Sequence, residues 1–225
     1  MTKENLFFDL DGTLTDSMPG ITRAVRYALR HFGIIEEDLN VLRPFVGPPL
    51  RDSFQEFYGF SDRDAKRAVA VFREYYTGRG WMENEPYEGI REMLEELKGA
   101  GKRLYVATSK PEDMAMRVLD HFGLTGCFEF VGAAISDSIR AKKDEVIVHV
   151  MESCDLLEKK DSILMVGDRK HDILGARKAG IQAMGVLYGY GSREELLTAG
   201  ADWLCETPKD LPTLLKTLET GGMSD

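Results

Sequence analysis

Short apolar runs recur along the chain, and four of them stop at a small or polar residue. Runs of this kind, together with stretches of helical spacing, are typical of a parallel sheet that has helices on both faces. We therefore predict strands at residues 6–10, 104–107, 162–166 and 183–187. In such sheets ligands bind at the carboxyl ends of the strands, and polar residues follow the strands at those ends here.

Apolar residues also repeat at the spacing of a helix that packs one face on a core. These stripes occupy residues 90–97, 114–119 and 146–150. Residues 17–85 carry helical patterns too, but contain no convincing buried strand. We predict that residues 17–85 are a helical insertion, so that residues 1–16 and 86–225 form the α/β core.

The composition narrows the range of partners. Lysine and arginine number 29 against 38 acidic residues, which gives a net charge of −9, and no basic run is interleaved with aromatic residues. We therefore expect no nucleic-acid partner. The sequence shows no signal-peptide pattern and no apolar segment of membrane-spanning length, so we expect no membrane partner. The three cysteines lack the spacing of a metal site and favour free thiols in a reducing, cytoplasmic compartment.

Two carboxylates, Asp9 and Asp11, lie at the end of the first apolar run. Residues i and i+2 of a strand point to the same side, so their charges would repel each other. Turn formation explains Asp11 followed by Gly12, but it does not explain Asp9 inside the apolar run. A divalent cation would offset the repulsion, and a pair of this kind also suits a nucleophile beside a general acid/base.

Weaker signals follow the second run and precede the third helical stripe. Thr108 and Ser109, followed by a proline, are typical of a helix N-cap; the alternative is that they hold a phosphoryl oxygen at the helix N-terminus. Lys142 and Lys143 come just before a predicted helix, where a cation is unfavourable. A solvated pair is the plain interpretation, and the alternative is a lysine that neutralises a nucleophile and a phosphoryl group.

Asp168 directly follows the third apolar run, and Asp172 comes four residues later, near the start of a helix. An aspartate at a helix start can be a simple cap, so Asp172 alone indicates little. Asp168 beside a buried run needs a partner. A metal ion shared with Asp9 would supply one.

Taken in order, DLDGTLTDS, ATSK, a lysine before a helix and VGDRKHD resemble the four motifs of the haloacid dehalogenase superfamily. The chain is most similar to the phosphoglycolate phosphatase-like branch, in which a helical cap follows the first motif. The likeness extends over nearly the whole chain, and the first and fourth motifs are the specific ones. It implies a Rossmann-like α/β core and an all-helical, substrate-selecting cap at residues 17–85.

The resemblance also implies roles for individual residues. Asp9 would be the nucleophile and Asp11 the general acid/base, and the motif lysine would be Lys143, with Lys142 as the alternative. The residues implied to contact the phosphoryl group or the substrate are Thr108, Ser109, Gly12 and Arg51. The expected cofactor is Mg²⁺, and its implied ligands are Asp9, Asp11 through its main-chain carbonyl and Asp168, with Asp172 in support.

The implied reaction is hydrolysis of a small phosphomonoester, similar to phosphoglycolate, through an aspartyl-phosphate. A 5'-nucleotidase, a pyrophosphatase or a phosphomutase would share the core residues and stays open. A receiver-type signalling domain also uses acids, a hydroxyl group and a lysine, but Asp9 on the first strand and the large insertion argue against it. We expect a small phosphorylated metabolite as the partner and a monomer or homodimer.

Overall fold

A computed structural model describes residues 2–135 and 142–220 and divides the chain into two compact units. One unit contains Met1–Leu14 and Pro86–Asp225, and the other contains Thr15–Glu85. The predicted division after residues 16 and 85 shares the second boundary and places the first slightly later.

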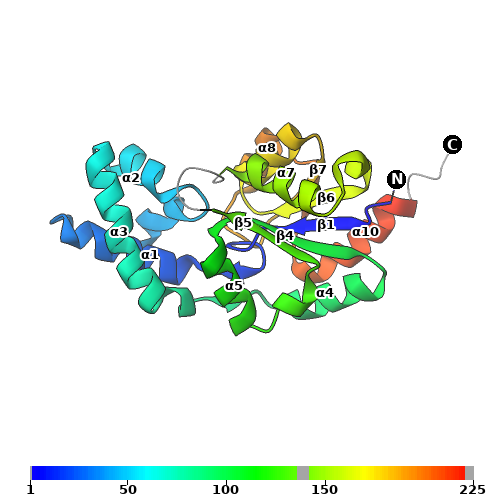
Figure 1. Ribbon diagram of the computed structural model, residues 1–225, viewed down its shortest axis with the longest axis horizontal. Coiled ribbons are helices and arrows are strands. Elements are labelled where there is room, and N and C mark those ends of the chain that lie inside the picture. The colour runs from blue at the N-terminus through cyan, green and yellow to red at the C-terminus, as the bar shows by residue number, and fades with distance from the viewer. Residues whose placement is uncertain (1, 136–141, 221–225) are drawn as a thin grey trace. The chain divides into compact units, whose positions relative to one another are not determined.

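The larger unit is built on a six-stranded sheet with the order β5-β4-β1-β6-β7-β8 (Figure 1). Its strands are β1 (Asn5–Phe8), β4 (Arg103–Pro111), β5 (Phe130–Ala134), β6 (Ile163–Gly167), β7 (Gln182–Val186) and β8 (Trp203–Cys205). All neighbouring strands pair in parallel, which confirms the predicted sheet. The edge strands β5 and β8 were not predicted, because they are short and lack a continuous run of large apolar residues.

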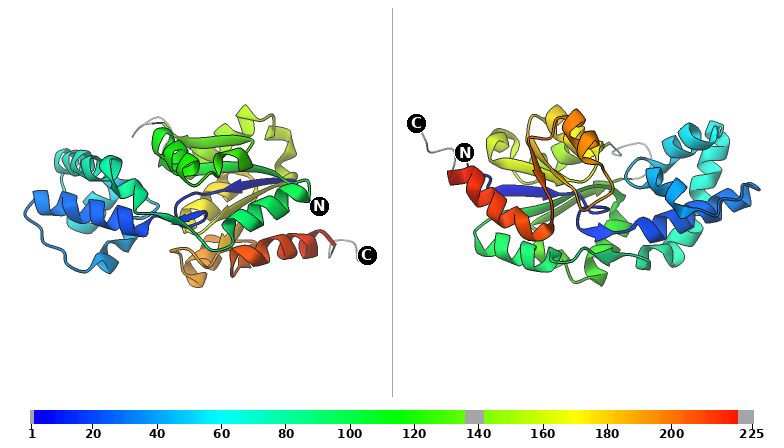
Figure 2. Two further views of the ribbon diagram at one scale, coloured as in Figure 1. Left: turned by 90° about the horizontal axis from the view of Figure 1, so that it is seen from below. Right: turned by 180° about the vertical axis from the view of Figure 1, so that it is seen from behind.

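Helices cover both faces of this sheet (Figures 1 and 2). The helices of the larger unit are α4 (Ile90–Gly99), α5 (Glu112–His121), α7 (Lys143–Ser153), α8 (Lys170–Ala179), α9 (Arg193–Ala199) and α10 (Leu211–Thr220). In Figure 1, α7 and α8 lie above the sheet and α4 and α10 lie below it. Short 3-10 segments occupy Thr125–Cys127, Leu157–Ser162 and Pro208–Asp210.

The core between the sheet and helices α7 and α8 packs against the central strand β1. Phe7 belongs to a buried cluster that includes Tyr105 and Met165 on the adjacent strands and Val146 and Ile173 on the helices. Because side chains alternate along a strand, the neighbours of Phe7 in sequence face the opposite core. The strand is therefore buried on both faces. Polar side chains can follow it only beyond the carboxyl end of the sheet.

Strand β4 extends further than predicted. It continues through Thr108 and Ser109 to Pro111, and α5 begins at Glu112 without a side-chain cap. The N-cap interpretation of Thr108 and Ser109 is therefore wrong. A run that reads as the start of a helix is extended backbone here; it lies at a register shift between Ala107 and Pro111, both of which pair with β5.

The smaller unit is helical, and its elements are α1 (Met18–His31), η1 (Leu39–Phe45), α2 (Leu50–Tyr58), α3 (Asp62–Gly78) and η2 (Gly80–Met82). A short two-stranded pair, β2 (Thr15–Asp16) with β3 (Glu85–Pro86), lies at the ends of this segment. Aromatic side chains fill its core, with Phe45 and Phe54 in edge-to-face contact at 5.0 Å between ring centroids.

Two expectations from composition can be compared with the structure. The three cysteines are all free, in agreement with the sequence. Within residues 2–135 and 142–220, none of the helices combines the length and the apolar character that crossing a bilayer requires.

Replacing Phe7 by alanine tests the packing of the central strand. Phe7 is fully buried and contacts Tyr105 edge to face at 5.2 Å between centroids, so Phe7→Ala should lower the free energy of unfolding by about 3–5 kcal/mol. Urea denaturation measures the loss. The control Leu197→Ala, at a position 53% exposed, should stay within about 0.5 kcal/mol of wild type. Equal effects of the two changes would contradict the assignment of Phe7 to the core.

Candidate active site

Asp9 is the first residue beyond β1, and the sheet fixes its position. Its main-chain N–H donates to the carbonyl of Val166 at 3.0 Å, which extends the pairing with β6 by one residue. Two residues after Phe7, its side chain falls on the α7 and α8 side of the sheet. The carboxylate is buried, and its Oδ1 accepts from the N–H of Leu10 at 2.8 Å and lies 2.7 Å from Nζ of Lys143.

Lys143, the first residue of α7, connects three segments. Its Nζ lies 2.7 Å from Oδ1 of Asp9 and 2.8 Å from Oδ1 of Asp172, and it donates to the carbonyl of Ala107 at 3.0 Å. Burial alone would lower the pKa of Lys143, but Asp172 and Asp9 outweigh it and raise the pKa above its ordinary value. Lys142 is exposed, so Lys143 is the member of the pair that contacts the predicted nucleophile.

Asp168 and Asp172 are held by the segment that follows β6. Asp168 is fully buried; its Oδ1 accepts from the hydroxyl of Thr13 at 3.3 Å, and its Oδ2 accepts from the N–H of Tyr190 at 2.8 Å. Asp172 lies in the first turn of α8, where its Oδ2 accepts from the N–H of Arg169 at 3.1 Å. The structure thus places both predicted acids at the same sheet edge as Asp9.

The three carboxylates form a group that could hold a metal ion. One oxygen from each of Asp9, Asp168 and Asp172 lies within 4.8 Å of the other two. Burial raises the pKa of Asp9 to about 6, against the opposing effect of Lys143, and burial together with Asp172 and Asp9 raises the pKa of Asp168 well above its ordinary value. A single lysine therefore leaves negative charge uncompensated. A hard cation with oxygen ligands fits this donor set.

Asp11 has a different partner from Asp9. Nζ of Lys110 lies 2.9 Å from Oδ1 and 2.8 Å from Oδ2 of Asp11. Asp9 and Asp11, two residues apart in the sequence, thus contact different ammonium groups. On the same strand as Lys110, Thr108 is buried and its hydroxyl accepts from the N–H of Lys110 at 3.2 Å.

Gly12 permits both the turn after Asp11 and the close approach of Asp168. Its φ is +87°, in the left-handed region that glycine tolerates. A Cβ at this position would lie 2.3 Å from Oδ2 of Asp168, so any other residue would force the buried carboxylate of Asp168 to shift. The structure therefore assigns Gly12 a contact with Asp168, while its predicted contact with the phosphoryl group stays a prediction.

Two other predicted substrate contacts are placed less directly. Ser109 is half-buried on β4. Arg51 lies on α2 of the helical unit, where its partly exposed guanidinium pairs with Asp62 of α3. Its role toward a substrate stays a prediction.

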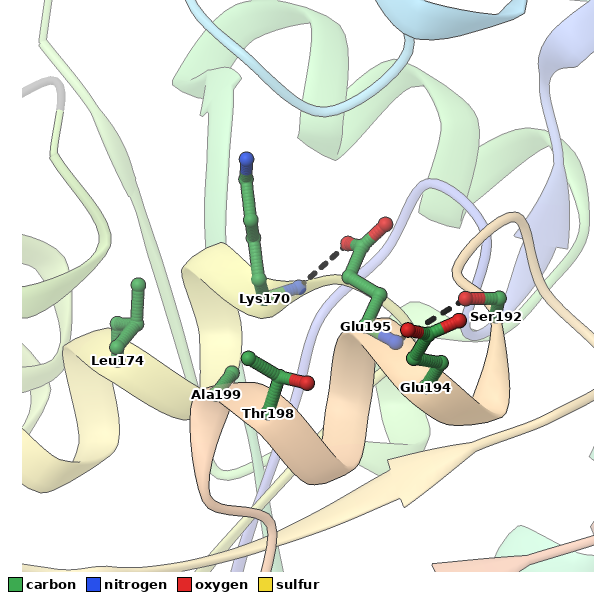
Figure 3. A pocket seen from close by; sticks show the side chains of 7 residues that line it. All are labelled: Lys170, Leu174, Ser192, Glu194, Glu195, Thr198 and Ala199. Atoms are coloured by element: carbon green, nitrogen blue, oxygen red, sulfur yellow. Dashed lines mark hydrogen bonds between the residues drawn. The ribbon is translucent and has the colours of Figure 1, made fainter.

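A hollow of about 450 Å³ lies between α8 and α9, and it contains none of the predicted site residues (Figure 3). Its lining residues are Lys170, Leu174, Ser192, Glu194, Glu195, Thr198 and Ala199. One of them, Glu195, contacts the segment that follows β6: its Oε1 accepts from Nε of Arg169 at 2.9 Å and from the N–H of Lys170 at 2.8 Å. Glu195 thereby fixes the segment that connects Asp168 to Asp172.

Sequence reasoning missed four residues that hold this site together: Thr13, Lys110, Tyr190 and Glu195. Lys110 offered a signal, since it follows Thr108 by two residues on what proves to be a strand. Tyr190 acts through its main chain, so its residue type carries no signal. Thr13 and Glu195 resemble ordinary loop and helix residues in the sequence.

Residues 6–186 match the model of the haloacid dehalogenase-like hydrolase family. The chain belongs to this family. The match confirms the resemblance drawn from the four motifs and the α/β fold that it implies.

Several relatives resemble the chain over nearly its whole length. It is 43% identical to a 5'-nucleotidase of Pseudomonas aeruginosa over 216 residues, and this match covers 96% of each chain. It is 37% identical to tyrosine-protein kinase PtkA of Mycobacterium tuberculosis, over 95% of this chain and 69% of the kinase. A phosphoglycolate phosphatase of Colwellia psychrerythraea is 30% identical, over 95% and 97% of the two chains.

The fold also matches that of solved structures. A crystal structure described as a predicted phosphatase from Clostridium acetobutylicum superposes with a TM-score of 0.92 at 42% identity. The match covers 97% of this chain and 100% of that one.

Replacing Asp168 by asparagine should stabilise the metal-free protein. The raised pKa of Asp168 means that ionisation costs stability, so its contribution falls as the pH rises above the unfolded value of about 3.9. Asparagine avoids this cost and can still accept from Thr13 or Tyr190. At pH 8 without metal, Asp168→Asn should therefore unfold with a free energy about 1–3 kcal/mol higher than wild type, and the gain should shrink toward pH 4.

Thermal unfolding with and without Mg²⁺ completes this test. Added Mg²⁺ should raise the melting temperature of wild type but not that of Asp168→Asn. The control Asp113→Asn, at an exposed position of α5, should keep the response to Mg²⁺. A variant less stable than wild type at every pH would show that the ionised carboxylate is stabilising in the absence of metal.

Gly12→Ala should cost more than backbone strain alone. Gly101 provides a matched control, because its φ is +79° and a Cβ there would meet nothing within 4 Å. Gly101→Ala should lose only the strain of the left-handed region, about 1–2 kcal/mol. Gly12→Ala adds the clash with Asp168, so it should lose more stability and also the response of the melting temperature to Mg²⁺. Similar losses in the two variants would argue against the close packing on Asp168.

Proposed function

We propose that this protein is a Mg²⁺-dependent phosphatase that hydrolyses small phosphomonoesters through a phosphate ester of Asp9. Its membership of a hydrolase family and the phosphatase names of its relatives support the reaction class. The single observation that carries the mechanism is the buried group of Asp9, Asp168 and Asp172 around Lys143. It combines a nucleophile, a fixed cation and metal ligands at one sheet edge.

Asp9 supplies the nucleophile. Among the described residues, both contacts recorded for its carboxylate go to Oδ1, which leaves Oδ2 for attack on phosphorus. The new Oδ2–phosphorus bond forms as the bond to the leaving oxygen breaks. Asp11 gives its proton to that oxygen, so that a neutral alcohol departs.

Water then completes the cycle. Asp11, now a carboxylate, takes a proton from a water molecule whose oxygen attacks phosphorus, and the bond to Asp9 breaks. The products are inorganic phosphate and the free Asp9 carboxylate, so the enzyme returns to its starting state. Throughout, the ammonium of Lys143 and the hydroxyl of Thr108 are the fixed groups that would stabilise the transferring phosphoryl group.

The donor set described above suits Mg²⁺, which prefers carboxylate and carbonyl oxygens. Asp9, Asp168 and the main-chain carbonyl of Asp11 would hold the ion, with Asp172 in support. When bound, it would supply positive charge that offsets the buried carboxylates and the phosphoryl oxygens.

The relatives favour two kinds of substrate. The 43% identity to a 5'-nucleotidase over 96% of both chains supports a nucleoside 5'-monophosphate, and the 30% identity to phosphoglycolate phosphatase supports a small phosphorylated acid. Both are phosphomonoesters, and both suit a core whose specificity comes from another part of the chain.

Asp9→Asn tests the reaction. The amide keeps the shape of the side chain but is not a nucleophile, so turnover should fall at least about a thousandfold while circular dichroism stays unchanged. The assay follows phosphate release from nucleoside 5'-monophosphates, phosphoglycolate, pyrophosphate and p-nitrophenyl phosphate, with Mg²⁺ and with EDTA. Asp113→Asn should remain fully active.

Undiminished hydrolysis by Asp9→Asn, or by wild type in EDTA, would overturn the proposal.

A separate assay measures phosphate transfer from ATP to a tyrosine-containing peptide, because one relative is named a tyrosine-protein kinase. Transfer to the peptide without phosphate release from any monoester would assign a transferase instead.

A further inference from the structure

The pair formed by Lys110 and Asp11 differs from the surface ion pairs of this protein. The side chains of Lys110 and Asp11 are only 4% and 14% exposed. The ammonium contacts both carboxylate oxygens, at 2.9 and 2.8 Å. A partly buried pair with two contacts restrains both side chains, whereas exposed pairs contribute little.

The backbone of β4 aims Lys110 at this position. The register between β4 and β5 shifts between Ala107 and Pro111, and irregularities of this kind redirect side chains next to active sites. Thr108 and Lys110 are two residues apart and are both buried. The N–H of Lys110 also donates to the hydroxyl of Thr108, so the proton of that hydroxyl points to another acceptor.

We propose that Lys110 is a positioning residue, whose ammonium group holds the carboxyl group of Asp11 for proton transfer, while its main-chain N–H, which side-chain variants keep, orients the hydroxyl of Thr108. This inference rests on the proposed function. The need for an anchor is physical: Asp11 lies in the turn at Gly12, outside the strand, where its side chain would otherwise sample several rotamers. Catalysis by a carboxyl group requires one fixed position.

Lys143 and Lys110 contact different groups of acids, so their side chains would have different roles. Lys143 contacts Asp9 and Asp172, which belong to the nucleophile and metal group. Lys110 contacts Asp11, the acid/base. Loss of Lys110 should therefore impair proton transfer to the leaving group and spare attack on phosphorus.

Substrates with different leaving groups provide the test. An alkyl phosphate, such as the best natural monoester of the panel, needs protonation of its leaving oxygen, whereas p-nitrophenyl phosphate does not. Lys110→Met keeps the apolar stem. In single-turnover reactions it should slow release of the alkyl leaving group about a hundredfold, with a much smaller effect on release of p-nitrophenol. Single-turnover release isolates this first step from hydrolysis of the aspartyl-phosphate, which uses Asp11 with both substrates. Asp11→Asn should show the same selective loss.

The double variant decides whether Lys110 acts through Asp11. Adding Lys110→Met to Asp11→Asn should cause little further slowing of leaving-group release in single turnover, because residues that act as a unit are not additive. Lys110→Arg, which keeps the charge, should restore part of the activity. Lys102→Met is the matched control: it removes another partly buried lysine, paired with Glu219, and should leave both rates unchanged.

The outcomes distinguish this inference from the proposed function. If wild type hydrolyses monoesters and Asp9→Asn does not, equal losses for both leaving groups or fully multiplicative losses in the double variant would overturn the role of Lys110 alone. Absence of any monoester hydrolysis by wild type would overturn both. Unfolding of the same four proteins should also reveal coupling between Lys110 and Asp11, and a coupling of zero would refute the pair. If Lys110→Met does not fold, Lys110→Gln takes its place.

Discussion

The structure of the site depends on the bridge that Lys143 makes between Asp9 and Asp172. These residues come from three separate parts of the chain, and each is buried. A buried carboxylate without a partner is costly, and a buried ammonium equally so. The bridge therefore makes the end of β1, the start of α7 and the start of α8 mutually dependent. None of the three can shift without leaving a charge unpaired.

The parallel sheet makes this bridge possible. Strand β1 lies between β4 and β6, so its carboxyl end is surrounded by the ends of both neighbours. Apolar residues such as Phe7 fix the strand from both faces, which places Asp9 within hydrogen-bonding distance of Lys143. Close packing extends beyond the strand: a Cβ on Gly175 would lie 2.9 Å from Cβ of Lys143, so α8 can approach α7 only with glycine there. Apolar packing thus sets the distance between the charged groups of Asp9 and Lys143.

The sequence predicted the parts of this arrangement that interrupt a pattern. Asp9 and Asp168 break or end apolar runs, and glycine after Asp11 signals a turn, so these positions stood out. Lys143 was assigned through the family resemblance. The spacing of Lys110 from Thr108 was a weak signal that became informative only with the structure, because the burial of Lys110 depends on a register shift in β4 and on a partner 99 positions away along the chain. The short edge strands β5 and β8 were missed for a related reason: neighbours, rather than their own composition, make them strands.

The same charges that would support the proposed reaction reduce the stability of the core. Burial and repulsion from Asp172 raise the pKa of Asp9 to about 6 and that of Asp168 well above its ordinary value, so ionisation of both groups costs stability in the absence of a cation. An attacking nucleophile must be ionised. A cation at this group would lower both pKa values and favour folding and reactivity together, because it stabilises the same ionised carboxylates. The side-chain carboxylate of Asp11, in contrast, already has a cationic partner in Lys110. Under the proposed function, these separate partners would let Asp9 stay ionised while Asp11 exchanges a proton.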